Sequence, residues 1–227
     1  IQLKSDTYLL GDDVDIHADV EGDVFSMKDI SNSAIAGLRV DGNADNAFSM
    51  DNSSNIELLS CSAQKMRQRG LKIAGECENI IVAGNIFSEN ASGGATVLDN
   101  ARQILFYENK CNNNYGCKND NAGFSFGFGL NLDKFPSEII MYKNESSKNQ
   151  SGGIYCDGLY KSYFINNTVT GNQKEGTCLD WQTFGCYLLK NIYQGNGWRA
   201  DQSDEILEAD EVLQDGRMED GSSKAKL

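Results

Sequence analysis

The sequence predicts an all-β fold, a three-sided parallel solenoid with about 24 residues in each coil. Three observations predict it. Pairs of asparagines five residues apart recur at nearly constant steps, short apolar runs precede them, and glycine opens a further alternating run after most of them. We expect residues 1–198 to form the solenoid and residues 199–227 to form a C-terminal extension that packs on it or caps it.

The asparagine pairs set the period. Their first members follow one another at steps of 24, 35, 23 and 24 residues, and Cys61 and Met66 take the two positions one coil earlier. Stacked coils place equivalent residues about 4.8 Å apart, so each amide can bond to the amide one coil away. We also expect each asparagine to adopt the left-handed conformation and so bend the chain. The pairs are Asn85 and Asn90, Asn109 and Asn114, Asn144 and Asn149, Asn167 and Asn172, and Asn191 and Asn196.

Each repeat carries three short strands. Apolar runs such as "IIVAG" and "ILFYE" precede the first asparagine, and an apolar residue usually lies two places after it. Alternating runs such as "GATVLD" and "GIYCD" follow the second asparagine. Runs of this length with a period of two are typical of strands and do not fit a helix.

Two regions depart from the repeat. Between Asn114 and Ile139 the coil is longer, so either "GFSFG" or "GLNLD" is the strand and the remainder is a loop, which is functional or a neutral insertion. Beyond Trp198 the period stops, and a short helix over 203–213 is expected to pack along the solenoid or to cover its open end.

Composition narrows the function. The net charge of −13 argues against non-specific nucleic-acid binding, which requires many lysines and arginines. The sequence contains no run of 18 apolar residues, so it predicts no membrane span. The chain starts at Ile1, and we expect that a signal peptide or more of the protein has been removed. The seven cysteines show no zinc-like spacing, and we expect buried thiols or disulfides before metal ligands.

The repeats "NIIVAGNIFSENASGGATVLDN" and "KSYFINNTVTGNQKEGTCLDW" resemble the generic coil of the right-handed parallel β-helix superfamily of pectate lyases and NosD-like proteins. The resemblance covers roughly residues 1–198 and implies a right-handed, single-stranded parallel β-helix. The same coil occurs in lyases, hydrolases, epimerases, tailspikes and adhesins, so the activity stays open. The resemblance to the pectate lyases of this superfamily implies a calcium-assisted β-elimination in which a lysine or arginine is the base. Here "SFGFG" stands where that lysine is expected, and Lys134 is the nearest substitute.

Alternation along the strand after the second asparagine predicts an outward column of aspartates, if "GLNLD" is the strand of the long coil. The column is Asp133, Asp157 and Asp180, and Asp99 lies one residue out of register. Stacked carboxylates could bind calcium or act as an acid and base pair. Alternatively, each aspartate simply ends its strand by bonding to turn amides.

Aromatic and basic residues flank this column. We assign Lys134 to the catalytic base or to a substrate carboxylate, and Tyr155 and Trp181 to stacking on sugar rings. Tyr160 and Arg102 complete the predicted substrate site. The single histidine, His17, is expected to have no catalytic role.

Two functions follow from this sequence. The first is a secreted or cell-surface protein that acts on a polysaccharide as a lyase, hydrolase or epimerase, with calcium as the candidate cofactor. The second is a non-catalytic solenoid that binds glycan or serves as a structural, adhesin-like or tailspike-like module. A calcium held by three or more carboxylates would favour the enzyme, and aspartates tied to turn amides would favour the binding or structural module.

Overall fold

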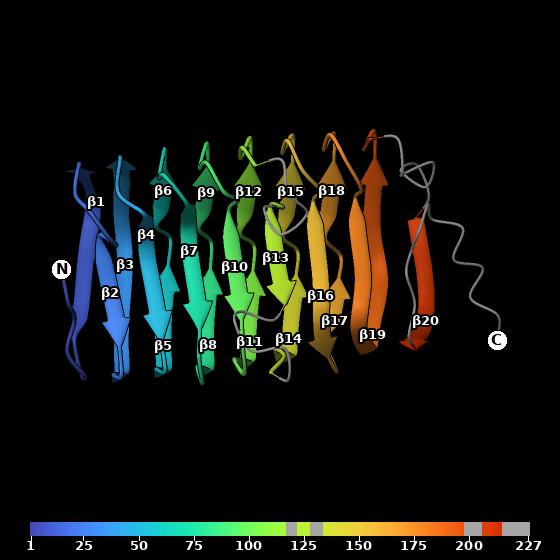
Figure 1. Ribbon diagram of the computed structural model, residues 1–227, viewed down its shortest axis with the longest axis horizontal. Coiled ribbons are helices and arrows are strands. Elements are labelled where there is room, and N and C mark those ends of the chain that lie inside the picture. Colours follow the sequence, from blue (N-terminus) through green and yellow to red (C-terminus); the bar gives the residue numbers. More distant parts are fainter. Residues whose placement is uncertain (117–121, 128–133, 198–205, 215–227) are drawn as a thin grey trace.

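The computed structural model in Figure 1 describes residues 1–116, 122–127, 134–197 and 206–214, with the backbone alone described for residue 13, residues 180–182, residue 184 and residues 206–214. The fold is a parallel β-solenoid of about seven turns, with about 24 residues per turn and no helix in the described part. The predicted fold class is therefore confirmed. The coils stack in chain order along one axis, from the N-terminal coils at the left of Figure 1 to β19 at the right.

Strands of the solenoid form three parallel sheets, which we call faces A, B and C. Face A contains β2 (Phe25–Lys28), β4 (Asn46–Asp51), β7 (Arg69–Ala74), β10 (Ala95–Leu98), β13 (Phe124–Gly127), β16 (Ile154–Tyr160) and the start of β19 (Thr177–Gln194). Face B contains the first parts of β1 (Tyr8–Ala18) and β3 (Ser31–Gly42), then β5 (Ser54–Leu59), β8 (Glu78–Ala83), β11 (Arg102–Tyr107), β14 (Ser137–Tyr142), β17 (Tyr163–Ile165) and the middle of β19. Face C contains the second parts of β1 and β3, then β6 (Ser62–Gln64), β9 (Ile86–Ser88), β12 (Lys110–Asn112), β15 (Glu145–Ser147), β18 (Thr168–Thr170) and the end of β19.

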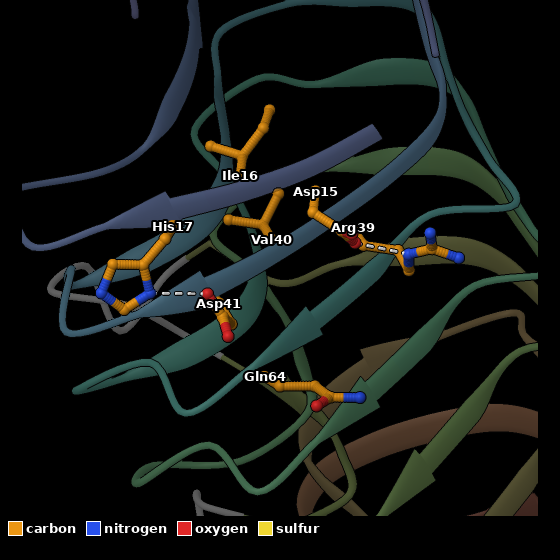
Figure 2. A pocket seen from close by; sticks show the side chains of 7 residues that line it. All are labelled: Asp15, Ile16, His17, Arg39, Val40, Asp41 and Gln64. Atoms are coloured by element: carbon orange, nitrogen blue, oxygen red, sulfur yellow. Dashed lines mark hydrogen bonds and ion pairs between the residues drawn. The ribbon is translucent and has the colours of Figure 1, made fainter. Parts of the chain in front are cut away.

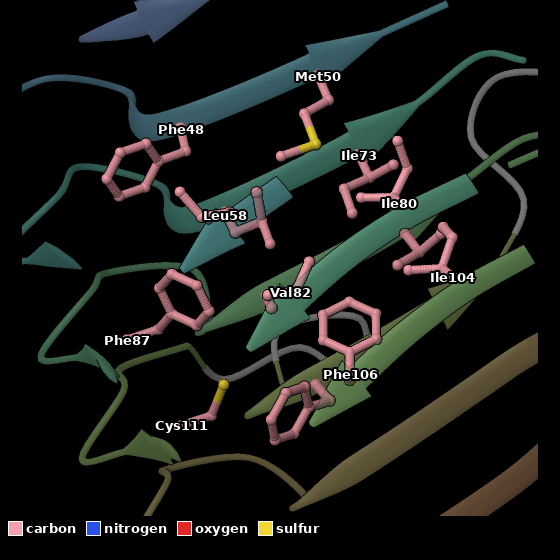
Figure 3. Packing of buried hydrophobic residues seen from close by; sticks show 14 of the residues in the cluster. Phe48, Met50, Leu58, Ile73, Ile80, Val82, Phe87, Ile104, Phe106 and Cys111 are labelled. Atoms are coloured by element: carbon pink, nitrogen blue, oxygen red, sulfur yellow. The ribbon is translucent and has the colours of Figure 1, made fainter. Parts of the chain in front are cut away.

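The core fills the interior of the solenoid with the inward residues of all three faces (Figure 3). Alternation along each strand points every second side chain inward, which is why the short apolar runs of the sequence become core strands. Phe106 of face B meets Phe124 and Phe126 of face A edge to face, with ring centroids 5.8 and 5.9 Å apart.

Asparagine ladders line the two corners that flank face C. The Asn109 amide donates to Asn144 Oδ1 at 3.0 Å and to the Val82 carbonyl at 2.7 Å. Its own Oδ1 accepts from the backbone N–H and the amide of Asn85 at 3.0 and 2.9 Å. The buried amide is thus satisfied from both neighbouring coils, as buried polar groups require. The predicted register of the pairs is confirmed.

The left-handed turn residue is not the asparagine, so that expectation was wrong. The residue just before each asparagine has positive φ, for example Glu108 at 53° and Lys143 at 56°. The asparagine side chain must point into the ladder, whereas the preceding residue lies at the surface, where lysine, glutamate, asparagine and glycine all occur. The residue before the asparagine therefore bends the chain, and the asparagine forms the ladder.

Glycines at the start of the face A strands are explained by packing. A Cβ on Gly94 would lie 2.5 Å from Cys111 Sγ, and a Cβ on Gly153 would clash with Val169 Cγ1. In both cases the clashing atom belongs to the inward residue of face C. Glycine therefore opens these strands because the neighbouring face fills the space that a side chain would occupy.

The long coil keeps its register with "GFSFG" as its strand. Here β13 pairs with β10 on one side and with β16 on the other, and Gly127 faces Asp157. The "GLNLD" alternative on which the aspartate column depended lies almost wholly outside the described residues. Ladder bonds still join Asn109 to Asn144 across the 35-residue step.

The short helix expected over 203–213 is wrong. Residues Ile206–Gln214 form β20, an antiparallel partner of β19 with Tyr187 opposite Val212. The last coil offers an edge of unpaired backbone groups, and pairing with that edge outweighs the weak helical pattern. In the described ranges, no helix has the length and apolarity to cross a membrane.

Candidate functional site

Face A carries an outward column of polar and aromatic side chains in its central coils. Ser49, Lys72, Thr96, Ser125 and Tyr155 occupy equivalent positions in successive strands. These side chains point away from the core, yet Thr96 and Ser125 are only 2% and 4% exposed. Neighbouring residues therefore cover the column at these two coils.

Two members of the column have unfilled bonding capacity. Ser125 Oγ is buried without a hydrogen-bond partner, whereas Thr96 Oγ1 accepts from Arg69 Nε at 2.9 Å. Lys72 is half-buried and makes no ion pair with the residues that the structure describes. A buried hydroxyl without a partner costs about 1–3 kcal/mol, but Ser125 Oγ is too deeply buried to meet a ligand, so Lys72 is the member of the column that can bind one.

The predicted aspartate column is only partly assembled. Asp157 of β16 is in register with Asp180 of β19, on the next coil. One coil earlier the same position is held by Gly127, and by Leu98 before it, so Asp157 has no aspartate in register on the two preceding coils. Asp133 itself, like the side chain of Asp180, lies outside the described residues.

Asp99 shows the alternative role that the sequence left open. Its carboxylate accepts a hydrogen bond from the Gly75 backbone N–H, 3.1 Å from Oδ2. Asp99 therefore closes a turn between two coils of face A.

The basic residues of the predicted site lie at the corner between faces A and B. Lys134 Nζ is 3.5 Å from Glu76 Oε1, and Arg102 Nη2 is 2.7 Å from Glu78 Oε2. Each cation thus already has a carboxylate partner.

The predicted aromatic residues divide between this corner and face A. Tyr160 packs against Phe135 at this corner, with ring centroids 5.6 Å apart, whereas Tyr155 lies on face A. For Trp181 only the backbone is described, on β19. The predicted site residues thus form two neighbouring groups and not one column.

Metal binding stays a prediction. Among the residues described, no group of three or more histidines, cysteines, aspartates or glutamates could hold a metal ion. Two of the three predicted calcium ligands, Asp133 and Asp180, lack described side chains, and the third, Asp157, is described.

Buried cysteines offer no activated nucleophile. Desolvation by burial raises the pKa of the Cys77 thiol to about 11 and the pKa of Cys111 well above its ordinary value. Both thiols therefore stay protonated near neutral pH and serve as core residues, as the sequence predicted.

A hollow on the N-terminal coils was missed by the sequence analysis (Figure 2). Nδ1 of His17 lies 2.8 Å from Asp41 Oδ1, and its Nε2 lies 3.2 Å from Asp19 Oδ2. These two hydrogen bonds, first to Asp41 and then to Asp19, raise the pKa of the exposed His17. The hollow has a volume of about 430 Å³ and is lined by Asp15, Ile16, His17, Arg39, Val40, Asp41 and Gln64.

The period could have revealed this hollow. His17 and Asp41 are 24 residues apart. Asp15 and Arg39 have the same separation, and Arg39 Nε lies 2.6 Å from Asp15 Oδ1. A separation of one coil places such residues side by side on face C.

Comparison with known proteins identifies the family of this chain. A family model described as "Right handed beta helix region" matches residues 23–193. No curated protein matches the chain by sequence.

Several solved structures share the fold. The A-module of the mannuronan C-5 epimerase AlgE4 from Azotobacter vinelandii superposes with a TM-score of 0.61 and 13% identity, over 87% of this chain and 74% of that one. The T265N mutant of the periplasmic alginate epimerase AlgG gives 0.60 and 14%, over 76% of this chain and 48% of that one. PfbA, a surface adhesin of Streptococcus pneumoniae, gives 0.53 and 11%, over 90% and 69%.

At these identities the likeness shows the fold alone, and the chain spans about half the length of AlgG. The family assignment rests instead on the family model, which covers most of the solenoid. The chain therefore belongs to the right-handed β-helix family.

Proposed function

We propose that the protein binds a polysaccharide along face A, outside the cytoplasm. The observation that carries this proposal is the outward column from Ser49 to Tyr155, in which hydroxyl, ammonium and phenol groups follow one another coil by coil. Strands of neighbouring coils are about 4.8 Å apart, so the column presents its groups at a regular spacing. A polymer with a regular repeat can meet such a column with several units at once.

The chemistry of the column suits a glycan that carries acid groups. The Lys72 ammonium can pair with a uronate carboxylate, and the Tyr155 ring lies three coils further along the same column. The net charge of −13 would repel an acidic polymer from most of the surface, which favours binding at a cation such as Lys72.

The structural neighbours support this proposal only in outline. AlgE4 and AlgG are named as epimerases of mannuronan and alginate, AlgG as periplasmic and PfbA as a surface adhesin. All three share the fold. Two of them, AlgG and PfbA, are named as periplasmic and as a surface protein. They supply no residue assignment for this chain.

Binding to a panel of acidic and neutral polysaccharides, measured by calorimetry, tests the proposal. We expect Lys72→Ala to weaken binding of the acidic polymers by about tenfold, as loss of one charge-assisted contact implies. Lys110→Ala, on face C, removes an equal charge and should leave binding unchanged. Absence of binding to every polymer, or equal binding by the Lys72→Ala variant, would exclude face A as the site.

A second candidate is a polysaccharide-modifying enzyme, a lyase, hydrolase or epimerase, centred on Asp157. It is favoured by the register of Asp157 with Asp180 on the next coil, beside Tyr155, because acid and base catalysis on sugars uses paired carboxylates. Calcium and Lys134 retain in it the roles that the sequence assigns to them.

Assays for unsaturated uronates and for new reducing ends, with and without a chelator, test the enzyme. Asp157→Ala should abolish any turnover and leave the fold intact. Unchanged turnover in that variant would remove Asp157 from the reaction.

A further inference from the structure

The outward side of face B is apolar over five consecutive coils. Two columns of side chains point away from the core on β8, β11, β14, β17 and β19. We call their ten members the apolar stripe: Ile81, Leu105, Ile140, Tyr163, Tyr187, Ala83, Tyr107, Tyr142, Ile165 and Leu189.

These residues are not needed for the core. On β8 the inward residues Ile80 and Val82 are buried, whereas Ile81 between them is 37% exposed. Ile140 and Tyr163 on later coils are 41% and 40% exposed. An exposed apolar surface of this continuity is typical of an interaction site.

We propose that the apolar stripe is the interface at which two copies of this chain pack face to face. Face B over these five coils, which is the apolar stripe together with the polar column beside it (Asn79, Gln103 and Glu138), measures roughly 500 Å² at about 4.8 Å between strands and about 3.3 Å per residue over six residues, and the stripe itself makes up about half of it. Two copies that meet over this face would therefore bury roughly 1,000 Å² in projection, the size at which specific interfaces begin. Sheets that pack with apolar faces together are a common arrangement in β proteins.

Charge favours a second copy on this face. None of the ten positions of the stripe is charged, although the chain carries a net charge of −13. The ammonium group of Lys143 lies at the edge of the stripe and pairs with Glu108 at 3.6 Å. Two copies that meet through the stripe thus keep their like charges on the outside.

The tyrosines of the stripe are poorly placed to stack on sugars. Tyr163 and Tyr187 lie face to face, with ring centroids 5.0 Å apart and planes 8° apart. Tyr107 and Tyr142 are also stacked, and Lys143 Nζ lies 5.1 Å from the Tyr142 centroid. Their ring faces already contact each other or the lysine, so a protein surface suits the stripe better than a glycan.

Sedimentation equilibrium over a range of concentrations tests the proposal. The wild-type chain should form a dimer that dissociates on dilution. Ile140→Lys places a charge at the centre of the stripe and should raise the dimer dissociation constant by more than about tenfold. The matched control is Ile86→Lys on face C, because Ile86 is also 41% exposed; it should leave the dimer unchanged. Circular dichroism verifies that both variants fold.

Three results would overturn the proposal. They are a wild-type chain that is monomeric at every concentration, a dimer that survives Ile140→Lys, and equal weakening by both variants. A monomeric wild type whose polysaccharide binding is lost in Ile140→Lys would make the stripe a carbohydrate surface instead. The Lys72→Ala variant separates this inference from the proposed function, since it should weaken glycan binding and keep the dimer.

Discussion

Two kinds of asparagine column run along this molecule, and they differ in what the side chain does. In the buried columns beside face C, Asn109 makes four hydrogen bonds between 2.7 and 3.0 Å. At the corner between faces A and B, Asn55 donates to Asn32 at 3.0 Å and accepts from Asn79 at 3.3 Å, in solvent.

The difference teaches that burial, and not the spacing of the asparagines, decides their role. In the exposed column the asparagine itself is the left-handed residue, with φ of 54° at Asn55 and 56° at Asn79. Later coils use Gln103 and Glu138 at that position. The exposed column therefore selects for backbone conformation, whereas the buried columns select for an amide that two coils share.

Asn109→Ala should produce the largest effect. It leaves the Asn85 amide and N–H without their acceptor and the Val82 carbonyl without its donor, all in a buried site. Each such group costs about 1–3 kcal/mol, so the free energy of unfolding should fall by about 3 kcal/mol or more. Urea denaturation measures it, and a loss below that of an exposed-column variant would contradict the comparison.

Gly153→Ala should have the next largest effect. The new methyl group would clash with Val169 Cγ1 and lie 2.8 Å from Asn172 Nδ2, so it disturbs both the core and a buried ladder. Overpacking of this kind costs about 1–3 kcal/mol. The neighbouring Gly152→Ala, whose nearest contact is the Glu175 carbonyl at 3.1 Å, is the control and should lose less in the same urea experiment.

Asn55→Gly should change stability by less than about 1 kcal/mol. Glycine keeps the left-handed backbone at no steric cost, and the lost bonds are exposed to water. Asn55→Ala tests the backbone term separately and should cost about 1–2 kcal/mol, because alanine is strained at positive φ. If the glycine variant lost as much as the alanine variant, the exposed ladder would be stabilising after all.

His17 gives the smallest expected effect, because its contacts between coils are fully exposed. Its bonds to Asp41 and Asp19 raise the folded-state pKa above the ordinary value of 6.5. The stabilisation is therefore complete below pH 6.5 and fades as the pH rises through the raised pKa. Thermal unfolding across this window should show a slope that His17→Gln removes, and a nuclear magnetic resonance titration of His17 should give a pKa above 6.5.

Much of the fold could be predicted because stacking converts sequence spacing directly into contact. The steps between the asparagines determined the ladders, and the alternation that predicted an outward Asp157 agrees with the burial of Ile154 and Cys156 on the same strand. The same spacing, applied to His17 and Asp41, would have found the hollow. The turn residue was misassigned because positive φ leaves no mark when lysine and glutamate adopt it as readily as asparagine.

Non-local pairing explains the remaining differences. "GFSFG" and "GLNLD" alternate equally well, and only the pairing of β13 with β10 and β16 selects the first. Likewise, the segment at β20 becomes a strand because the edge of β19 is available. In the candidate site, Gly127 holds the column position one coil before Asp157, and Asp133 lies outside the described residues, while Asp157 and Tyr155 do lie on face A.

The ladder between Asn114 and Asn149 spans 35 residues with a hydrogen bond of 3.0 Å, as short as those that span 24. Loop closure grows slowly with length, by about 0.6 kcal/mol for each doubling. This corner should accordingly accept grafted segments of quite different lengths without strain on the coils above and below. Such a scaffold can acquire new recognition through one exchanged loop, while the columns preserve its shape.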